Sequence, residues 1–361
     1  MNDKVTLMKG NEALAMAMIR YGADGYFGYP ITPQSEVLEK LEEEMPWETT
    51  GMVVLQAESE VAAINMVYGG AMTGKAVCTS TSSPGFSLMQ EGVSYLAASE
   101  VPALLINVQR GGPGLGTIHA SQADYFQACK GGGHGDYHMI VLAPSSVQEM
   151  ADMVALGFDL AFKYRCVSMI LADGTIGQLM EKVVLPEQRP RRTDDEIRQQ
   201  CPWAVNGRKG MRPSNVVTSL ELDDDKMEEN NWRFQACYRE IEKNETRCEL
   251  IDVEDCDYLI TAFGTTARVA MKTMELARAE GIKVGMFRPI TLWPFPEQQL
   301  REAAKNVKGI LCVELNAGQM VEDVKLAVEC KMPVEHYGRF GGNVPTPDEL
   351  LKVLKEKLIN K

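Results

Sequence analysis

The sequence predicts an α/β fold with a parallel sheet in each of two domains, and three observations support this. The chain has 361 residues, more than one ordinary domain needs and about right for two. Short apolar runs alternate with segments of helical periodicity, which predicts parallel strands covered by helices. The alternation degrades between about 187 and 257, so we expect a domain at 1–186, an excursion or linker, and a second, smaller domain at 258–361.

The alternation is clearest in the first domain. Its expected strands lie at 25–29, 52–56, 75–80, 101–109, 139–143 and 167–171. Its expected helices lie at 8–21, 33–44, 58–73, 86–97 and 147–164. A glycine-rich stretch follows the strongly apolar run at 101–109.

Residues 187–257 contain proline, arginine and acidic clusters and few strand-like runs, and we expect one helix there near 232–243. Alternation then resumes. The second domain's expected strands lie at 258–262, 283–287, 309–314 and 334–337. Its expected helices lie at 267–280, near 297–305, near 319–330 and at 346–359.

Composition excludes several classes of function. The formal net charge is −13 and no run of lysine and arginine offsets it, which argues against nucleic acid as a partner. No stretch of about 18 apolar residues occurs and the start has no signal-peptide pattern, so we expect a cytoplasmic protein without a membrane span. The nine cysteines form no C-x-x-C pair and only four histidines occur, so we expect neither an iron–sulfur cluster nor another metal site on this chain.

Two glycine motifs imitate nucleotide-binding loops. Gly69, Gly74 and Lys75 match most of a P-loop, but the next residue is Ala76, which lacks the hydroxyl that Mg²⁺ requires. The end of a helix at Gly74 explains this stretch better. Residues 111–116 (GGPGLG) lack the spacing of a dinucleotide fingerprint, but they follow a strand, so we interpret them as a loop on the ligand side of the sheet.

Three segments together carry a family resemblance: 28–33 (GYPITP), 56–65 (QAESEVAAIN) and 107–114 (NVQRGGPG). This set resembles the α-type subunit of the 2-oxoacid:ferredoxin oxidoreductases, which use thiamine diphosphate. Residues 287–294 (FRPITLWP) are typical of that family's second domain. The resemblance implies a pyrimidine-binding domain, like domain I of pyruvate:ferredoxin oxidoreductase, followed by a transketolase C-terminal-like domain. Residues 115–137 look most like the branched-chain (2-oxoisovalerate) group.

Glu60 is the residue on which the expected chemistry depends. It lies near the start of an expected helix, and its helical neighbours Ala63, Ile64 and Val67 are apolar, so we expect it to be at least partly buried. The resemblance implies that Glu60 hydrogen-bonds N1′ of the aminopyrimidine and thereby promotes loss of the thiazolium C2 proton. The alternative is an acid favoured by the helix macrodipole, a role that Glu58 fits better.

Thr32 has two interpretations. With Pro33 it is a good N-cap and N1 pair for the following helix. The resemblance implies instead that Thr32 lies beside the thiazolium and the substrate, and capping is compatible with that role. The residues before it, Tyr29, Pro30 and Ile31, would line the cofactor pocket.

Arg110 opens the glycine loop after the most apolar strand, a position that suits a clamp for a carboxylate. The resemblance assigns it to the carboxylate of the 2-oxoacid or to coenzyme A, and the alternative is a surface arginine paired with an acid. Residues 79–85 (TSTSSPG), with Ser82 and Gly85, would border the pyrimidine, or form a polar turn that caps the next helix.

The chain departs from complete thiamine enzymes at the diphosphate site. They use a Gly-Asp-Gly motif with an asparagine about 25–30 residues later, as the resemblance implies. Here residues 172–174 read Ala-Asp-Gly, and the nearest asparagine pair, Asn230 and Asn231, is too distant. We therefore expect a β subunit to hold the diphosphate and Mg²⁺. The [4Fe-4S] clusters would also lie on partner chains, and the family implies γ and small ferredoxin-like δ subunits.

The predicted function is the α subunit of a 2-oxoacid:ferredoxin oxidoreductase. It would take part in the coenzyme A-dependent oxidative decarboxylation of a 2-oxoacid to acyl-CoA and CO₂, with reduction of ferredoxin. The first-choice substrate is 3-methyl-2-oxobutanoate, and the alternatives are 2-oxoglutarate, pyruvate or an aryl pyruvate. A non-catalytic assembly subunit with the same fold is the alternative from another class.

Overall fold

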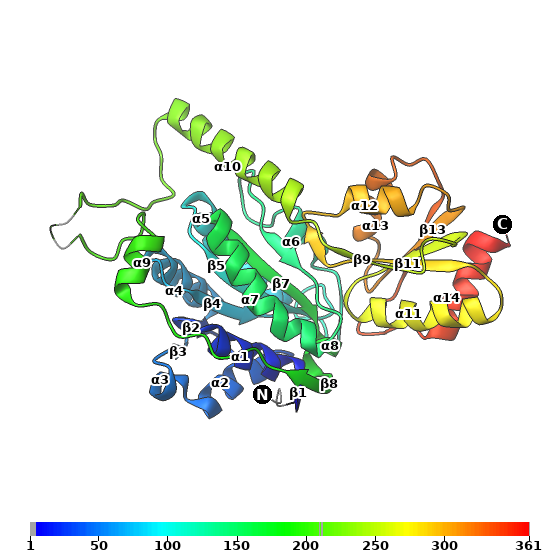
Figure 1. Cartoon of the computed structure of the whole chain (residues 1–361), viewed down its shortest axis with the longest axis horizontal. Helices are drawn as coiled ribbons and strands as arrows, with labels where there is room; N and C mark the ends of the chain where they lie inside the picture. The colour runs from blue at the N-terminus through cyan, green and yellow to red at the C-terminus, as the bar shows by residue number, and fades with distance from the viewer. Residues whose placement is uncertain (1–4, 209, 211, 361) are drawn as a thin grey trace.

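The larger domain is built on a seven-stranded sheet, shown in the computed structural model of Figure 1, which describes residues 5–208, 210 and 212–360. Its strand order is β12-β6-β7-β5-β4-β2-β3, and only β12 runs antiparallel to its neighbour. The strands are β2 (Gly25–Gly28), β3 (Val53–Gln56), β4 (Val77–Thr81), β5 (Ala103–Gln109), β6 (Ile140–Leu142), β7 (Val167–Asp173) and β12 (Thr291–Trp293). Every residue of β4, β5 and β7 is buried, as expected for central strands of a parallel sheet covered on both faces. Strands β5 and β7 are mainly apolar, whereas β4 carries the hydroxyl residues Thr79, Ser80 and Thr81.

Helices cover this sheet in two groups. In one group α1 packs against α2 and α7, and in the other α4 packs against α5. The helices are α1 (Gly10–Tyr21), α2 (Ser35–Glu44), α4 (Glu60–Met72), α5 (Ser83–Ala98) and α7 (Val147–Tyr164), with the short helices α3 (Pro46–Thr49), α6 (Tyr125–Cys129) and α8 (Gly174–Gln178) between them.

The smaller domain has a five-stranded sheet of order β14-β13-β10-β11-β9, in which only β9 is antiparallel to its neighbour. The strands are β9 (Cys248–Ile251), β10 (Tyr258–Thr261), β11 (Val284–Pro289), β13 (Gly309–Glu314) and β14 (Val334–Gly338). The helices are α11 (Gly264–Ala279), α12 (Glu297–Ala303), α13 (Met320–Ala327) and α14 (Pro347–Leu354), which continues as one π-helical turn, η1 (Lys355–Ile359).

The sequence predicted the long elements but missed strands that depend on a distant partner. The helix expected from residue 8 begins at Gly10, because Met8 and Lys9 belong to β1 (Val5–Lys9), which pairs with β8 (Met180–Val184). Strand β9 was also missed, and it lies within 187–257 although it pairs with β11. The predicted domain limits stay predictions.

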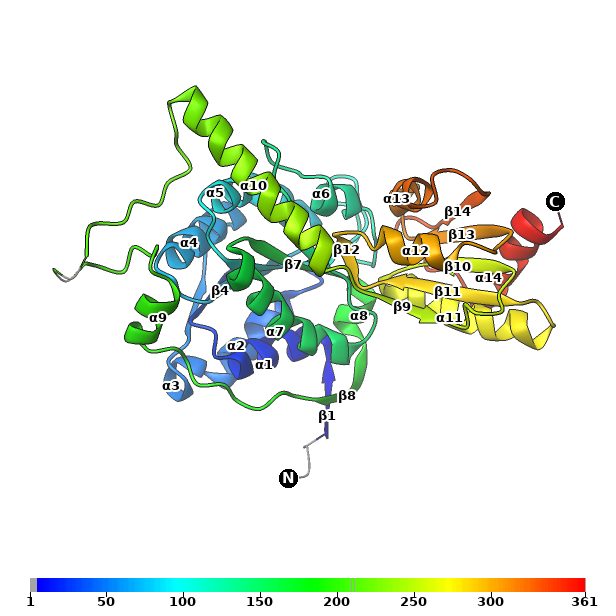
Figure 2. The same cartoon turned by 45° about the horizontal axis from the view of Figure 1, so that its top comes forward.

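The connecting segment carries α9 (Asp194–Gln200) and α10 (Asp224–Asn244), which is longer than the helix expected near 232–243. Both views show one end of α10 projecting beyond the larger domain (Figures 1 and 2). Before α9, Arg191 forms an ion pair of 2.9 Å with the buried Asp24 and ties the segment to the start of β2. No helix in the described part of the chain is long and apolar enough to cross a membrane.

The two domains are joined by more than the chain that connects them. Residues 287–294, expected as a feature of the second domain, leave its sheet after β11 and return to the first sheet as β12. There Trp293 pairs with Val141 and stacks on His138. Arg288 forms ion pairs of 2.7 Å with Glu149 of α7 and with Glu249 of β9. The second domain is therefore held firmly against the first.

Candidate active site

The predicted site segments gather at one edge of the first sheet. Residues 29–32 follow β2, residues 82–85 follow β4, and Arg110 follows β5. These three strands are neighbours and run parallel, so their carboxyl ends meet at the same edge, where open α/β sheets bind their ligands.

Glu60 is buried at the first position of α4, with 5% of its surface exposed. Ser59 caps the helix by accepting a hydrogen bond of 3.2 Å from the amide of Ala62. Glu58 remains exposed, so the two acids have different environments, as expected. Ala63, Ile64 and Val67 are buried on the same face, which confirms the predicted burial of Glu60.

Gly85 leaves open the space beside the Glu60 carboxylate. A Cβ atom at Gly85 would lie 2.5 Å from Glu60 Oε1 and would also overlap Thr81 Oγ1. Within the described residues, the Glu60 side chain has no hydrogen-bonding partner. The buried hydroxyls of Thr79, Thr81 and Ser82 lack partners too. Ser82 occupies the N-cap position of α5, but its side chain makes no capping hydrogen bond. These polar groups are thus available to a ligand.

The prediction that Thr32 caps the next helix is wrong. Helix α2 begins at Ser35 with Gln34 at the N-cap, because Thr32 lies too far before the first turn. The Thr32 side chain is exposed, and its backbone carbonyl accepts a hydrogen bond of 2.8 Å from Arg110 Nη1. Gln34 holds the preceding loop, donating to the carbonyl of Tyr29 at 3.2 Å and accepting from Ser80 at 2.5 Å.

Within this loop, Pro30 is exposed while Tyr29 and Ile31 are half-buried. Asn11 of α1 holds the next carbonyl, that of Pro33, at 2.6 Å. The backbone of the loop is therefore supported from both sides, while its side chains remain partly accessible.

Arg110 is 8% exposed, and no carboxylate lies within ion-pair distance of it among the described residues, which contradicts the surface ion pair considered above. Its Nη1 bonds the Thr32 carbonyl, and its buried Nε has no partner. Arg110 and Ala120 form an isolated antiparallel β-bridge, which brings together the two ends of the glycine loop 111–119. A buried guanidinium with unused donors suits an anionic group such as a carboxylate.

Sequence reasoning missed a polar network beneath Arg110. Asp124, in the loop before α6, accepts hydrogen bonds from Ser83 Oγ at 2.6 Å and from Asn107 Nδ2 at 2.9 Å. Ser83 Oγ also accepts from the Arg110 amide at 3.0 Å. The signal available in the sequence was Asn107 and Gln109, two polar residues within an otherwise apolar buried strand.

Asp173, the aspartate of the partial motif match Ala-Asp-Gly at 172–174, makes structural contacts. It is buried, and it accepts from the amides of Thr175 and Ile176 at the start of α8. It also accepts from the amide and the hydroxyl of Thr265 in the second domain, at 2.8 and 2.5 Å. Across the described residues, no group of three histidine, cysteine, aspartate or glutamate side chains could hold a metal ion.

The other sequence features have structural roles as well. All nine cysteines are free thiols, and six of them are buried. Gly74 follows α4 in the left-handed conformation, and Lys75 pairs with Asp194 at 3.0 Å, which confirms the end of a helix there.

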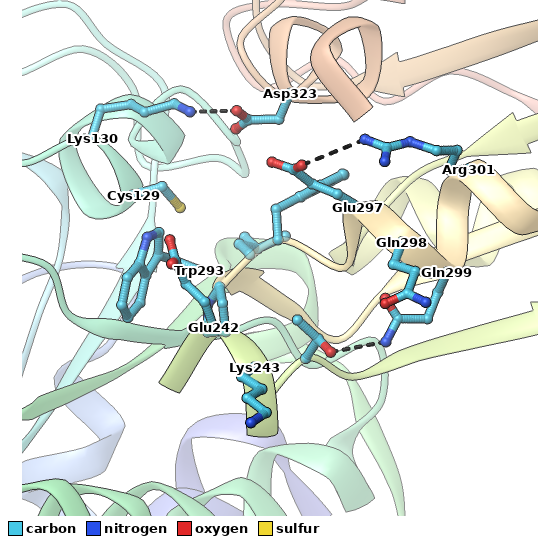
Figure 3. Close-up of a pocket in the computed structure, with 14 residues that line it drawn as sticks. Cys129, Lys130, Glu242, Lys243, Trp293, Glu297, Gln298, Gln299, Arg301 and Asp323 are labelled. Carbon is cyan, nitrogen blue, oxygen red and sulfur yellow. Dashed lines mark hydrogen bonds and ion pairs between the residues drawn. The ribbon is translucent and has the colours of Figure 1, made fainter. Parts of the chain in front are cut away.

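A polar pocket of about 550 Å³ lies between the domains, away from the predicted residues (Figure 3). Figure 3 shows Lys130, after α6, directed at Asp323 of α13, and Glu297 and Arg301 projecting from α12. Trp293 lines the same pocket. Four of its charged side chains form two ion pairs, Lys130 with Asp323 and Arg301 with Glu297. We therefore interpret the pocket as part of the contact between the domains and not as part of the candidate active site.

Fold and site together define the class. The protein is an α/β protein with a buried glutamate, free hydroxyls and a guanidinium at the ligand edge of a parallel sheet, which fits the aminopyrimidine half of a thiamine diphosphate site. Residues 16–244 match the family model "Pyruvate flavodoxin/ferredoxin oxidoreductase, thiamine diP-bdg". Residues 256–350 match "Pyruvate:ferredoxin oxidoreductase core domain II". The chain belongs to the 2-oxoacid:ferredoxin oxidoreductase family, as an α-type subunit.

Similar proteins agree with this assignment. The chain is 47% identical to ketoisovalerate oxidoreductase subunit VorB of Methanothermobacter marburgensis, over 97% of each chain. It is 35% identical to 2-oxoglutarate synthase subunit KorA of the same organism, over 95% of this chain and 96% of the relative. The solved 2-oxoglutarate:ferredoxin oxidoreductase from Magnetococcus marinus has a TM-score of 0.84 at 28% identity, covering 98% of this chain and 65% of that one. A split-gene transketolase, at 13% identity and TM-score 0.60, shares the fold.

Proposed function

We propose that this chain is the α subunit of an oxidoreductase that converts 3-methyl-2-oxobutanoate, coenzyme A and oxidised ferredoxin to acyl-CoA, CO₂ and reduced ferredoxin. The observation that carries the proposal is the buried Glu60 carboxylate, which has no partner and faces the space that Gly85 leaves open. The choice of oxoacid is supported by the 47% identity to a ketoisovalerate oxidoreductase subunit, against 35% to a 2-oxoglutarate synthase subunit.

When bound, thiamine diphosphate supplies the electron sink for decarboxylation. Glu60 would hold a proton at N1′ of the aminopyrimidine, and the hydroxyls of Thr79, Thr81 and Ser82 would border the ring. Arg110 would bind the carboxylate of the oxoacid, or coenzyme A later in the cycle. Thr32 would contribute its exposed side chain beside the substrate while its carbonyl steadies Arg110.

Partner subunits complete the enzyme in this proposal. Asp173 is engaged between α8 and α11, so a β subunit would hold the diphosphate and Mg²⁺. The [4Fe-4S] clusters would lie on γ and ferredoxin-like δ subunits, because the cysteines of this chain form no cluster motif. The complex would act in the cytoplasm and pass electrons to ferredoxin.

The substitution Glu60→Gln tests the proposal. In the reconstituted complex it should lower kcat by at least about 100-fold, because the amide cannot exchange a proton with N1′. Gel filtration should show that the complex still assembles.

Glu58→Gln is the matched control, since Glu58 is exposed two residues earlier, and it should keep normal turnover. Normal turnover in Glu60→Gln would instead favour the non-catalytic assembly subunit.

A further inference from the structure

Asp124 is a carboxyl group that the reaction proposed above does not use. It lies on the loop between β5 and α6, and no cation is within ion-pair distance of it in the described residues. Both hydrogen bonds to its side chain come from neutral donors, Ser83 Oγ at 2.6 Å and Asn107 Nδ2 at 2.9 Å, and both reach the same oxygen, Oδ2. Burial raises the pKa of Asp124 above its ordinary value. Burying a carboxyl group without a cation costs free energy unless its hydrogen bonds offset that cost.

Ser83 connects Asp124 to Arg110. A hydroxyl has one proton to donate, and the shorter contact of Ser83 Oγ is with Asp124, at 2.6 Å, against 3.2 Å to the Arg110 carbonyl. With its proton directed at Asp124, Ser83 Oγ presents a lone pair to the Arg110 amide at 3.0 Å. Asp124 therefore orients the Ser83 hydroxyl, whose oxygen accepts the hydrogen bond that holds the Arg110 backbone.

Asn107 closes the network. Its Nδ2 donates to Asp124 and its Oδ1 accepts from the Ser83 amide at 3.0 Å. Gln109 accepts from the Asp124 amide at 3.1 Å. The two polar residues of the motif before Arg110 thus hold the loop that carries Asp124, and Ser83 links this network to the Arg110 backbone, where the glycine loop begins.

The second domain fixes the same loop on both sides of Asp124. Gln319 bonds the Ala123 carbonyl and the Phe126 amide, each at 2.8 Å. Gln122 exchanges hydrogen bonds with Leu315 through its backbone amide at 3.1 Å and its side chain at 3.0 Å. The loop that carries Asp124 is therefore anchored to the second domain.

We propose that Asp124 is a positioning residue for Arg110: held in place by the second domain, it orients the Ser83 hydroxyl and so fixes the backbone from which Arg110 reaches the Thr32 carbonyl and the substrate anion. This inference rests on the proposed role of Arg110. It gives the second domain a task in substrate binding although none of the predicted site residues lies in it.

The test is a set of four variants in the reconstituted complex, with steady-state KM and kcat measured for the oxoacid and for coenzyme A. Arg110→Ala should raise the KM for one of them by at least about tenfold, through loss of a charge-assisted contact. Asp124→Ala should raise the same KM by at least about fivefold, whereas Asp124→Asn, whose amide oxygen can accept both hydrogen bonds, should stay within about threefold of the wild type. The double variant Asp124→Ala/Arg110→Ala should be no worse than Arg110→Ala alone, because both changes remove one interaction.

Asp173→Asn is the control, since Asp173 is also a buried acid near the domain junction but does not touch Ser83 or Arg110. It should lower the unfolding temperature without the selective rise in KM. An unchanged KM in Arg110→Ala would remove the proposed role of Arg110 itself. A raised KM in Arg110→Ala with a normal KM in Asp124→Ala, or losses that multiply in the double variant, would overturn the positioning role alone.

Discussion

The polar residues at this site differ in whether their side chains have hydrogen-bond partners. The side chains of Asp124, Ser83 and Asn107 are hydrogen-bonded to one another or to neighbouring backbone, whereas those of Glu60, Thr79, Thr81 and Ser82 lack hydrogen-bond partners within the described chain. Buried polar groups without partners cost free energy unless something else binds them. In the proposed function, the groups without partners are those that a ligand would bind, and the groups with partners hold the site in shape.

Gly85→Ala should disable the site without unfolding the protein. The added methyl group would overlap Glu60 Oε1 and Thr81 Oγ1, and displacing a catalytic carboxylate by about 1 Å can cost on the order of 100-fold in rate. We expect kcat/KM of the reconstituted complex to fall by at least about tenfold.

Gly69→Ala on α4 is the matched control. A Cβ there meets nothing within 4 Å, so the change should stabilise the helix by about 0.5–1 kcal/mol in a thermal unfolding experiment. Normal activity in Gly85→Ala would show that the space beside Glu60 is not needed.

At the scale of elements, the end of α10 is anchored by one acid. Glu245 follows α10 and is 3% exposed. Burial opposes its charged form, but hydrogen bonds from Lys163 at 2.6 Å, Tyr164 at 2.7 Å and Arg247 at 2.8 Å outweigh burial and lower its pKa to about 2. The C-terminus of α7 and the entry to β9 are thereby joined.

Glu245→Gln should destabilise the isolated chain in a pH-dependent way. A carboxyl group whose pKa is lower in the folded state stabilises the fold above its ordinary pKa of 4.5, and that stability is lost as the pH falls toward 2. In urea unfolding at pH 7 we expect a loss of about 2 kcal/mol, shrinking as the pH falls below 4.5.

Glu242→Gln, an exposed acid one turn earlier on α10, should show no such loss. An equal deficit of Glu245→Gln at pH 7 and pH 3 would contradict the assigned cause.

Elements were predictable where their signal is local. The bounds of α7 and β13 agree with the sequence prediction, because each is long or bounded by clear turns. Strands β1, β8, β9 and β12 were missed. Each is short, and all four form antiparallel pairs with strands distant in the sequence, so no local pattern distinguishes them from loop.

The whole molecule is two domains joined at one junction. Asp173 bonds Thr265, Gln122 bonds Leu315, and β12 returns from the second domain to the first sheet. These contacts place the second domain against the loop that carries Asp124. The chain thus presents the buried Glu60 and Arg110 near the same edge of its larger sheet.

Substrate choice belongs to this scale, because the proposed site is completed by partner subunits. With the assembled complex and a viologen acceptor, kcat/KM for 3-methyl-2-oxobutanoate should exceed that for 2-oxoglutarate by at least about tenfold, since a site for a branched apolar chain leaves a second carboxylate unpaired. Pyruvate and an aryl pyruvate complete the panel. A preference for 2-oxoglutarate would replace the proposed substrate but leave the reaction class unchanged.

The sequence by itself determined the α/β class, the order of the main elements and the residue types of the candidate site. Glu60 and Arg110 were recognisable because the short motifs that contain them resemble those of a known family, and Arg110 also directly follows a strongly apolar strand. Only the tertiary structure decided that Thr32 contacts Arg110 through its carbonyl and does not cap a helix, and that Asp124 is linked to Arg110 through Ser83. Such contacts depend on strand order and domain packing, which bring together residues far apart in the chain and leave no periodic signal in the sequence.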